Sequence, residues 1–399
     1  MRFQSAIVCF VAVALLAGCE QPPAPAIQAV TAPVPPPAAV AFDQAVLNAG
    51  NAVFAATVAA GGRQTVVIDP LVNGVTGEQS VATRALADRL ADLARQRYPQ
   101  LDLQPFNATT VAGAPLVMVG TFTPVNAQNQ PAGAREAFRF CLVMADLKSG
   151  KTVAKSVARA LPFGVDSTPT QAFSDSPTWS DDPIVKAYVS TCQATKVGDP
   201  IPAAYLNGIL TAAIVNQAME AYDAGRYKEA LALYSDARTS PAGDQLRVFN
   251  GLYLTHAKLG QRDQAVAAFG DLVDYGLRRD RLAVKLLFRP GSTAFIADPQ
   301  VSGAYDMWLR QIAGRSVATG SCLQVTGHTS TSGSAALNER LSVLRAESVK
   351  GRLEQDASAL NGRVLAAGLG GQQNLVGTGA DNASDALDRR VEFKVVPAC

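Results

Sequence analysis

Hydrophobic and polar positions follow different patterns in successive parts of the chain. An unbroken apolar run at residues 6–16 is followed by a Pro- and Ala-rich stretch without helical or strand periodicity. Short apolar runs with one helical pattern come next, then a helical region, then alternating strand and helix patterns. We predict a multidomain α/β and α protein: an N-terminal α/β sandwich, a helical repeat region and a C-terminal βαβαβ sandwich. The predicted divisions are 1–18, 19–41, 42–200, 201–280 and 281–399.

The first division has the features of a secretory signal peptide. Its apolar run, residues 6–16, follows Arg2 and is much shorter than the roughly 20 residues of a membrane-spanning helix. Leu16-Ala17-Gly18-Cys19 resembles the bacterial lipobox, which implies that Cys19 carries the acyl chains, palmitate among them, of a lipoprotein. Three such chains are enough for stable anchoring. Glu20 is not the Asp that retains lipoproteins in the inner membrane, so the resemblance implies an outer-membrane anchor facing the periplasm. The alternative is an ordinary signal peptide that ends near a cysteine.

Residues 19–41 have the composition of a tether. They contain Gln21-Pro-Pro-Ala-Pro25 and Pro33-Val-Pro-Pro-Pro37, which oppose helix formation and favour extended polyproline II. At about 3.1 Å per residue, such a segment reaches roughly 60–70 Å from a membrane.

Residues 42–200 show the pattern of an α/β domain. Leu86, Leu90 and Leu93 recur at helical spacing within residues 80–98, which predicts an amphipathic helix. The stretch 162–183 is rich in Pro, Ser, Asp and Thr, and we expect a long surface loop there. Strands are predicted at residues 65–69, 115–122, 138–144 and 152–157. This order weakly resembles the N-terminal domain of TolB and the LpoB-type lipoproteins.

Residues 201–280 contain an internal repeat at a shift of 35 residues. The paired positions are Gly225/Gly260, Ala230/Ala265 and Tyr234/Phe269. They resemble tetratricopeptide repeats, in which Gly makes the inter-helix turn, Ala permits close helix contact and the aromatic ring fills the next groove. Two units are fewer than a stable array needs, so neighbouring helices must cap them. The alternative is a plain helical hairpin, and a repeat array would indicate a docking surface for a protein partner.

From residue 284 the chain alternates strands and helices up to its last strand. Strands are predicted at 284–288, 322–326, 365–368 and 391–396, with helices at 301–312 and 335–354. Two motifs in this region, Gly327-His328-Thr329 with the helix that follows it and Arg389-Arg390-Val391-Glu392-Phe393, resemble the signatures of the OmpA/Pal/MotB family. The resemblance covers about 115 residues and implies an OmpA-like domain that binds peptidoglycan non-covalently.

The resemblance also implies a ligand and a set of residues that bind it. In the family, a loop Asp and a helix Arg clamp the diaminopimelate of the peptidoglycan peptide stem, and Arg suits a carboxylate because its planar fork donates two parallel bonds. The family Asp is Ser330 here, which cannot balance an ammonium charge. We therefore expect wall binding that is weaker, altered in preference or absent. The matching positions are Thr329, Ser330, Asn338, Leu341, Arg345 and Arg389.

Asn338 and Arg345 are seven residues apart and share a helix face, while Leu337, Leu341 and Leu344 have the spacing of a core-facing stripe. An alternative for Arg345 is a solvated side chain that pairs with Glu339 or Glu347. Three further residues have structural alternatives: His328 as a buried histidine at the end of a strand, and Arg389 and Arg390 as structural arginines instead of wall contacts.

Four cysteines remain once Cys9 and Cys19 are set aside, namely Cys141, Cys192, Cys322 and Cys399. An oxidising periplasm permits disulfides. Of the three possible pairings, only Cys141–Cys192 with Cys322–Cys399 keeps each bridge within a domain. The OmpA-like resemblance adds that the last strand runs antiparallel beside the second, which would bring Cys399 to Cys322. Two free thiols are the alternative.

Composition excludes several classes of function. A net charge of +2 without a dense Lys/Arg cluster opposes nucleic-acid binding. The chain has two histidines and lacks phosphate loops, nucleophile elbows and metal-ligand clusters, so we predict no enzyme, no cofactor and no metal. The leading hypothesis is an outer-membrane lipoprotein that tethers the envelope to peptidoglycan and docks a protein through its middle region. The alternative is an accessory or regulatory lipoprotein of an envelope machine, in which wall binding only localises it.

Overall fold

A computed structural model describes residues 36–59, 61–131, 135–180, 182–377, 379, 383–396 and 399. The expected signal peptide, the lipidation site Cys19 and residues 19–35 of the expected tether lie outside this range. Residues 36–399 form one compact unit. The last residues of the expected tether belong to the fold, because Ala39–Val40 (β1) pairs in parallel with β7, Lys151–Ala160.

A seven-stranded sheet lies in the N-terminal part of the described chain, with the path β1-β7-β6-β5-β2-β4 and β3 beside β5. The centre of the sheet reads as continuous apolar runs because both of its faces are covered. β5, β6 and β7 form an antiparallel meander, whereas β2 is parallel to both of its neighbours, β4 and β5. The remaining bounds are Gln64–Ile68 (β2), Val72–Asn73 (β3), Leu101–Gln104 (β4), Leu116–Val125 (β5) and Ala137–Asp146 (β6).

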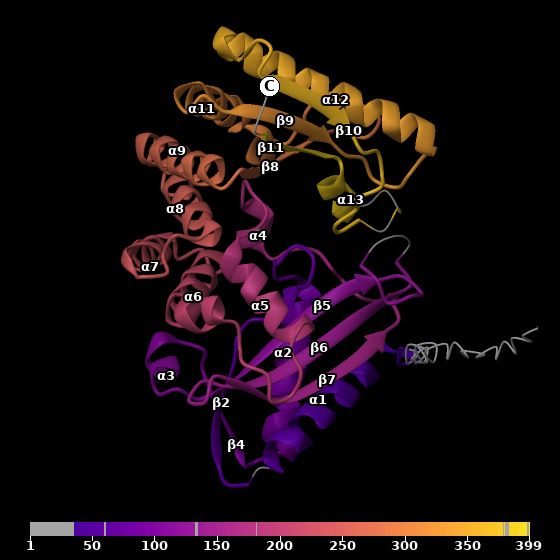
Figure 1. Ribbon diagram of the computed structural model, residues 1–399, viewed down its shortest axis with the longest axis vertical. Helices are drawn as coiled ribbons and strands as arrows, with labels where there is room; N and C mark the ends of the chain where they lie inside the picture. Colours follow the sequence, from indigo (N-terminus) through magenta and orange to yellow (C-terminus); the bar gives the residue numbers. More distant parts are fainter. Residues whose placement is uncertain are drawn as a thin grey trace, which may run out of the picture. The chain divides into compact units, whose positions relative to one another are not determined.

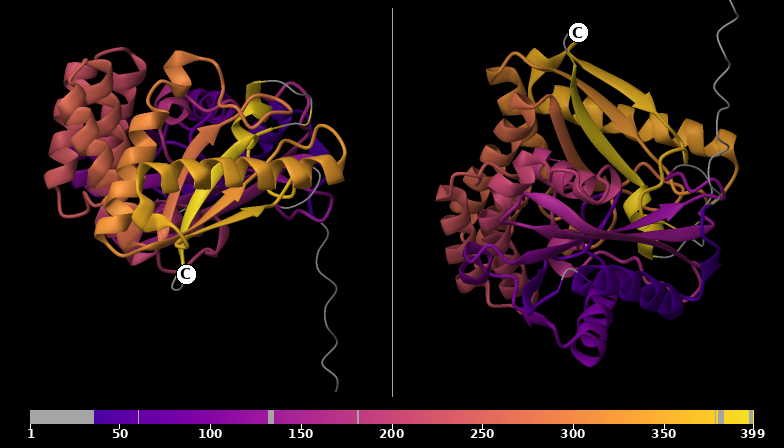
Figure 2. Two further views of the ribbon diagram at one scale, coloured as in Figure 1. Left: turned by 90° about the horizontal axis from the view of Figure 1, so that it is seen from above. Right: turned by 60° about the horizontal axis from the view of Figure 1, so that its bottom comes forward.

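Helices cover both faces of this sheet (Figures 1 and 2). One face packs against α1 (Phe42–Val58) and α2 (Val81–Arg97). The other packs against α5 (Pro183–Gln193) and the start of α6 (Ala203–Asp223), with α3 (Ala108–Ala112) beside them. α2 is the helix predicted at 80–98, and it starts there because Ser80 and Thr83 form a reciprocal capping box.

The segment 162–183 is only partly the surface loop that we predicted. Its first half is exposed, but residues 169–180 are mostly buried and include the short helix α4, Gln171–Asp175. Thr178 bridges Val284 in antiparallel fashion, and the Trp179 amide donates to the Ala283 carbonyl at 3.3 Å. The prediction was wrong because the polar residues of this segment bond to partners that are distant in the sequence.

Four antiparallel helices follow, α6, α7 (Tyr227–Thr239), α8 (Leu246–Lys258) and α9 (Arg262–Arg278). Gly225 and Gly260 make equivalent turns with φ of 74° and 71°, a region that other residues rarely adopt. Tyr234 and Phe269 are both buried, as the repeat predicted. The helical region therefore contains two similar hairpins, and its likeness to tetratricopeptide repeats stays a prediction.

The C-terminal sheet has the order β10-β9-β11-β8, with β9 and β10 parallel and β11 antiparallel to both β9 and β8. One face packs against α11 (Tyr305–Ala318) and α12 (Ala335–Asp356), as Figure 1 shows. The helix predicted at 301–312 is instead the short α10 (Pro299–Ser302) followed by α11. The strands are Arg281–Leu287 (β8), Cys322–Gly327 (β9), Val364–Gly368 (β10) and Arg390–Val396 (β11), with α13 at Ala383–Asp388.

Both predicted disulfides are present. Cys141–Cys192 joins β6 to α5 with the two Cα atoms 5.9 Å apart, and Cys322–Cys399 has a Cα separation of 5.4 Å. The second bridge forms because Val396 pairs with Cys322 across the antiparallel strands β11 and β9, so the end of the chain returns to the start of β9.

A buried ion pair joins a strand of the C-terminal sheet to the segment that precedes α2. The Lys285 ammonium on β8 lies 3.5 Å from the Glu78 carboxylate and 2.8 Å from the Phe173 carbonyl, over the Trp179 ring. Lys285 is 4% exposed and Glu78 2%. Burial raises the pKa of Glu78 to about 7 and lowers that of Lys285.

Candidate functional site

The loop between β9 and α12 holds the first group of predicted site residues. β9 ends at Gly327, where an added Cβ would lie 1.9 Å from the Ser342 carbonyl oxygen, so only glycine lets the strand approach the helix so closely. α12 then begins after Ser334, whose hydroxyl caps the Leu337 amide. The residues between these two points, 328–333, form a short loop at the helix N-terminus.

Hydrogen bonds tie this loop to its surroundings. The Thr329 amide donates to the Gly370 carbonyl at 2.9 Å, and the Ser330 hydroxyl lies 2.8 Å from that of Ser332. Asn338 reaches back from α12 and donates to the Ser332 carbonyl at 3.0 Å. The buried Thr329 hydroxyl has no partner in the described part of the chain. The structure therefore brings Thr329, Ser330 and Asn338 to one loop, and their role in binding stays a prediction.

Arg345 projects from α12 beneath this loop and is fully buried, 0% exposed. Its guanidinium donates to three backbone carbonyls and lies over the Phe288 ring, 5.1 Å from the centroid. Burial, with the charge of Arg389, lowers the pKa of Arg345 to about 10. The three acceptors are Ser292 at 3.0 Å, His328 at 3.0 Å and Arg289 at 2.9 Å.

Arg345 is therefore not the solvated helix arginine that we considered as an alternative, and its role in ligand binding stays a prediction. It does not reach solvent, and it pairs with neither Glu339 nor Glu347. A guanidinium has five N–H groups, of which three bond to carbonyls and two have no acceptor among the described residues. The Arg345 guanidinium therefore holds the loop backbone in place. Its positive charge is buried, and all of its hydrogen-bond acceptors are neutral carbonyls.

The two arginines of the C-terminal motif have different surroundings. Arg389 is 7% exposed and its Nε donates to the Phe288 carbonyl at 3.4 Å, on the residue that Arg345 also contacts. Arg390 is 1% exposed and bonds to Glu392 at 2.6 Å. Arg390 is therefore structural, and Arg389 lies close to the charge of Arg345.

His328 is buried at the end of β9, and its Nδ1 has no partner in the described ranges. Burial and the charge of Arg390 lower the pKa of His328 to about 3. The imidazole is therefore neutral at physiological pH, which agrees with the structural alternative for this residue.

The expected leucine stripe of α12 is not its buried face. Leu337 is 58% exposed and Leu344 47%, while Leu341 is half-buried. The helix instead buries Asn338, Ser342, Arg345, Ala346, Val349 and Leu353. The leucines lie one residue away from this set, about 100° around the helix, so their periodicity was correct and the face was wrong.

Two residues that shape the site were missed. The buried Ser342 hydroxyl accepts from the Gly370 amide at 2.9 Å and so links α12 to the chain after β10. The Asp388 carboxylate accepts from the amides of Leu375 and Gly377 at 2.7 and 2.8 Å. For Ser342 the sequence signal was the helix motif of the family resemblance, and for Asp388 it was an acid before the double arginine.

Comparison with known proteins supports the family assignment for this part of the chain. Residues 287–386 match the OmpA family, and we assign them to that family. None of the curated proteins compared with the sequence matches it. The match does not extend to residues 42–280, so the resemblances suggested for that region stay predictions.

Several solved structures are similar to the C-terminal part. The peptidoglycan-associated lipoprotein from Burkholderia pseudomallei is 24% identical over 28% of this chain and 89% of that chain, with a TM-score of 0.25. The cell wall anchor of the T6SS from Pseudomonas aeruginosa is 24% identical over 33% of this chain and 95% of that chain, with a TM-score of 0.24. The periplasmic domain of Helicobacter pylori MotB (residues 78–256) is 18% identical over 28% of this chain and 69% of that chain, with a TM-score of 0.23.

Two further properties concern the described residues. None of their helices combines the length and apolar character that a bilayer span requires. No three His, Cys, Asp or Glu side chains in those ranges are grouped so that they would hold a metal ion.

Proposed function

We propose that the protein binds peptidoglycan non-covalently through its C-terminal domain and thereby links the cell wall to a lipid anchor. The observation that carries the proposal is the OmpA-family match of residues 287–386, within which Thr329, Ser330, Asn338 and Arg345 converge at one loop. We take the ligand to be the diaminopimelate of the peptide stem. The binding residues would be Thr329, Ser330 and Asn338, with Arg345 and Arg389 behind them.

The charges of the site support a carboxylate ligand. Arg345 is positively charged and bonds only to neutral carbonyls, so its field would stabilise an anionic group at the loop. Arg345 is fully buried. It would therefore act by holding the loop and through its field, and direct contact with the ligand would require the backbone near Ser292 to move.

Ser330 sets the strength of binding in this proposal. A serine hydroxyl accepts a hydrogen bond but gives no charge-assisted bond to an ammonium, which would be roughly twice as strong. We therefore expect weak binding by the natural chain and tighter binding by Ser330→Asp. Ser348→Asp introduces the same charge at an exposed position of α12 outside the loop and is the matched control.

Co-sedimentation of the full chain with purified peptidoglycan tests the proposal. We expect the natural chain to sediment with peptidoglycan and to be released by a diaminopimelate-containing stem peptide. Ser330→Asp should bind several-fold more tightly, and Ser348→Asp should resemble the natural chain. A natural chain that stays in the supernatant together with Ser330→Asp would refute wall binding.

The other end of the proposed link is the lipid on Cys19, which would supply the membrane affinity and place the protein at the outer membrane, facing the periplasm. Cys19→Ser should leave the chain unprocessed or soluble in the periplasm. Fractionation of cell membranes measures this, and normal outer-membrane recovery of the variant would exclude the lipid anchor.

A second candidate function is that of an accessory subunit in an envelope assembly. It is favoured by the large folded region outside the family match, in which residues 45–213 have two cores of their own. In that case the α/β and helical domains would bind the protein partner, and wall binding would only localise them. Chemical cross-linking in cells, followed by mapping of the linked residues, distinguishes the two. Links confined to residues 281–399 would count against the second candidate.

A further inference from the structure

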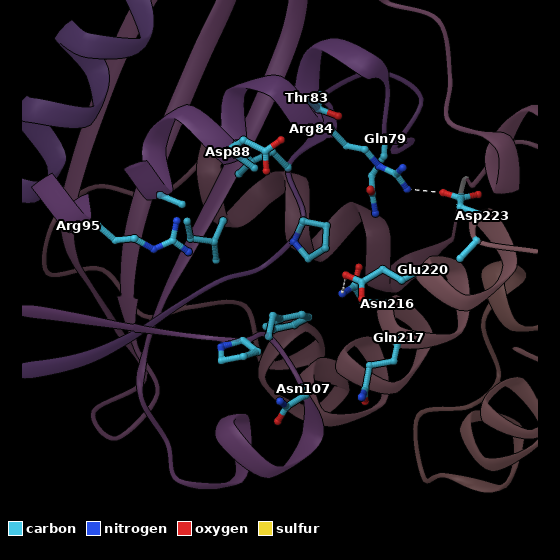
Figure 3. A pocket seen from close by; sticks show the side chains of 18 residues that line it. Gln79, Thr83, Arg84, Asp88, Arg95, Asn107, Asn216, Gln217, Glu220 and Asp223 are labelled. Carbon is cyan, nitrogen blue, oxygen red and sulfur yellow. Dashed lines mark hydrogen bonds and ion pairs between the residues drawn. The ribbon is translucent and has the colours of Figure 1, made fainter. Parts of the chain in front are cut away.

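A cleft of about 750 Å³ lies on the N-terminal domain, far in sequence from the OmpA-family residues (Figure 3). Its walls are α2 and the C-terminal half of α6, and its floor is formed by the segments that follow β2 and β4. The volume falls in the range of roughly 300–1,000 Å³ that is typical of small-molecule sites.

The sheet topology explains why a cleft opens here. β4 and β5 flank β2 on opposite sides, and all three are parallel. After β2 the chain forms β4 on one side of it and then crosses over to form β5 on the other side. The strand order therefore reverses at β2. In open α/β sheets, ligands bind at the carboxyl ends of the strands at such a reversal. Pro70 follows β2 and Phe106 follows β4, and both line the cleft.

The side-chain amides of Gln79 and Asn216 face this space. Gln79 is 7% exposed, and its side-chain amide has no partner in the described part of the chain. Asn216 is 6% exposed and donates to Glu220 at 2.9 Å, and its oxygen has no partner within the same residues. Neither amide is sealed from solvent, so both can bond to water or to a ligand in the cleft. Figure 3 shows both side chains directed into the cleft.

The charges around the cleft have both signs. Arg84 and Asp223 bond to each other across one end. At the other end lies Arg95, whose partner Asp92 is as exposed as Arg95 itself, 65% each, and such exposed pairs contribute little. Asp88 and Glu220 have no cationic partner within the described ranges. The cleft therefore offers one guanidinium and two carboxylates to a ligand, in addition to its amides.

We propose that this cleft binds a short peptide with free ends. The amides of Gln79 and Asn216 would bond to peptide N–H and C=O groups, since each amide both donates and accepts. Arg95 would receive the terminal carboxylate, and Asp88 or Glu220 the terminal ammonium. Pro70, Pro105 and Phe106 supply an apolar floor for side chains. A neutral sugar would leave the charges unmatched, and a polyphosphate would meet more carboxylates than free cations.

Native mass spectrometry of the full chain tests the proposal. The probes are an equimolar pool of uncapped tetrapeptides, the same pool acetylated and amidated at its ends, and a pool of neutral disaccharides. We expect retention of uncapped peptides and at least about tenfold less of the capped pool. Retention of the disaccharides instead, equal retention of both peptide pools, or no retention at all would overturn the proposal.

Variants with matched controls locate the site. For the best-retained peptide, calorimetry should show binding about fivefold weaker for Gln79→Leu and about threefold weaker for Arg95→Gln. Gln96→Leu and Arg97→Gln make the same replacements at exposed positions of α2 outside the cleft and should bind like the parent. Ala91→Trp fills the cleft from a half-buried position and should abolish binding. Variants and controls with equal affinity would place the peptide elsewhere.

This proposal is independent of wall binding. All of the substituted positions lie outside residues 281–399, so each cleft variant should sediment with peptidoglycan as the parent does. Loss of wall binding alone would leave the cleft proposal standing, and loss of peptide binding alone would leave the proposed function standing.

Discussion

Replacing Arg345 tests whether this arginine acts mainly by holding the loop. Arg345→Met keeps the length of the side chain but removes the three bonds to the carbonyls of Ser292, His328 and Arg289. Arg345→Met should destabilise the C-terminal domain, because these carbonyls lose their donor at once. Arg340→Met, at an exposed position of the same helix, is the matched control.

The expected magnitude follows from the burial of each carbonyl. The His328 bond is fully buried, so its carbonyl stays unsatisfied at a cost of about 1–3 kcal/mol. The other two bonds are partly buried, and water can replace them at about 0.5–1.5 kcal/mol each. Removing a buried charge that lacks a counter-ion also removes its desolvation penalty, which offsets part of the lost stability. We therefore expect a net loss of about 2–4 kcal/mol in the free energy of unfolding.

Urea unfolding followed by tryptophan fluorescence measures this loss. The chain has two tryptophans. Trp308 lies in the core that the C-terminal sheet shares with the helical hairpins, and Trp179 packs against residues of β8, so the signal reports on the part of the chain that contains Arg345. An Arg345→Met variant that unfolds at the same urea concentration as Arg340→Met would refute the reasoning. If it also lost peptidoglycan binding, Arg345 would be a ligand contact instead.

Three further predictions use the same assay. Lys285→Met should cost about 3–5 kcal/mol because it leaves Glu78 buried without its cation, and adding Glu78→Leu should restore most of the loss; a double variant as unstable as the single one would count against the pair. The pKa of His328 is lowered from 6.5 to about 3, so its contribution is complete above pH 6.5 and is lost as the pH falls. Between pH 8 and pH 5 the natural chain should lose about 2 kcal/mol relative to a His328→Gln variant, in which the other titrating groups are unchanged, and equal pH dependence of the two would contradict this. Reducing Cys322–Cys399, which closes a loop of 77 residues, should cost on the order of 4 kcal/mol in the chain-entropy model; an unchanged midpoint in Cys322→Ser would argue against it.

Local signals in the sequence predicted much of the fold but not what buries the polar residues. The capping box that starts α2 and the strands β9 and β11 are local or strongly patterned. The OmpA-like resemblance implied Cys322–Cys399, and Cys141–Cys192 belonged to the pairing that keeps each bridge within one domain. α1 was not predicted because Ala, Asn and Gly dilute its apolar stripe. The burial of residues 169–180 was missed because it depends on bonds such as Thr178 to Asn250 at 3.0 Å, across 72 residues.

Prediction of the candidate site had the same limit: residues that are close in the sequence were located, but contacts with distant segments were not. The motif located Thr329, Ser330 and Asn338 because loop and helix N-terminus are adjacent in the sequence. It could not give the state of Arg345, since two of the three acceptors, Arg289 and Ser292, come from a segment more than 50 residues earlier. The exposure of Leu337 and Leu344 was missed because a periodicity fixes the spacing of a face but not which face meets the sheet.

The Cys322–Cys399 bridge has a mechanical consequence. A protein that joins a membrane to a wall carries load, and an applied force would first lengthen whatever part of the chain is free to extend. All the proposed wall-contact residues lie within the 77-residue loop that this bridge closes, and the Cys141–Cys192 bridge closes another of 51 residues. Neither loop can be extended by force while its disulfide bond is intact. Under tension the compliance would therefore reside in the helical hairpins between the bridges, and the loop at residues 328–333 would keep its shape.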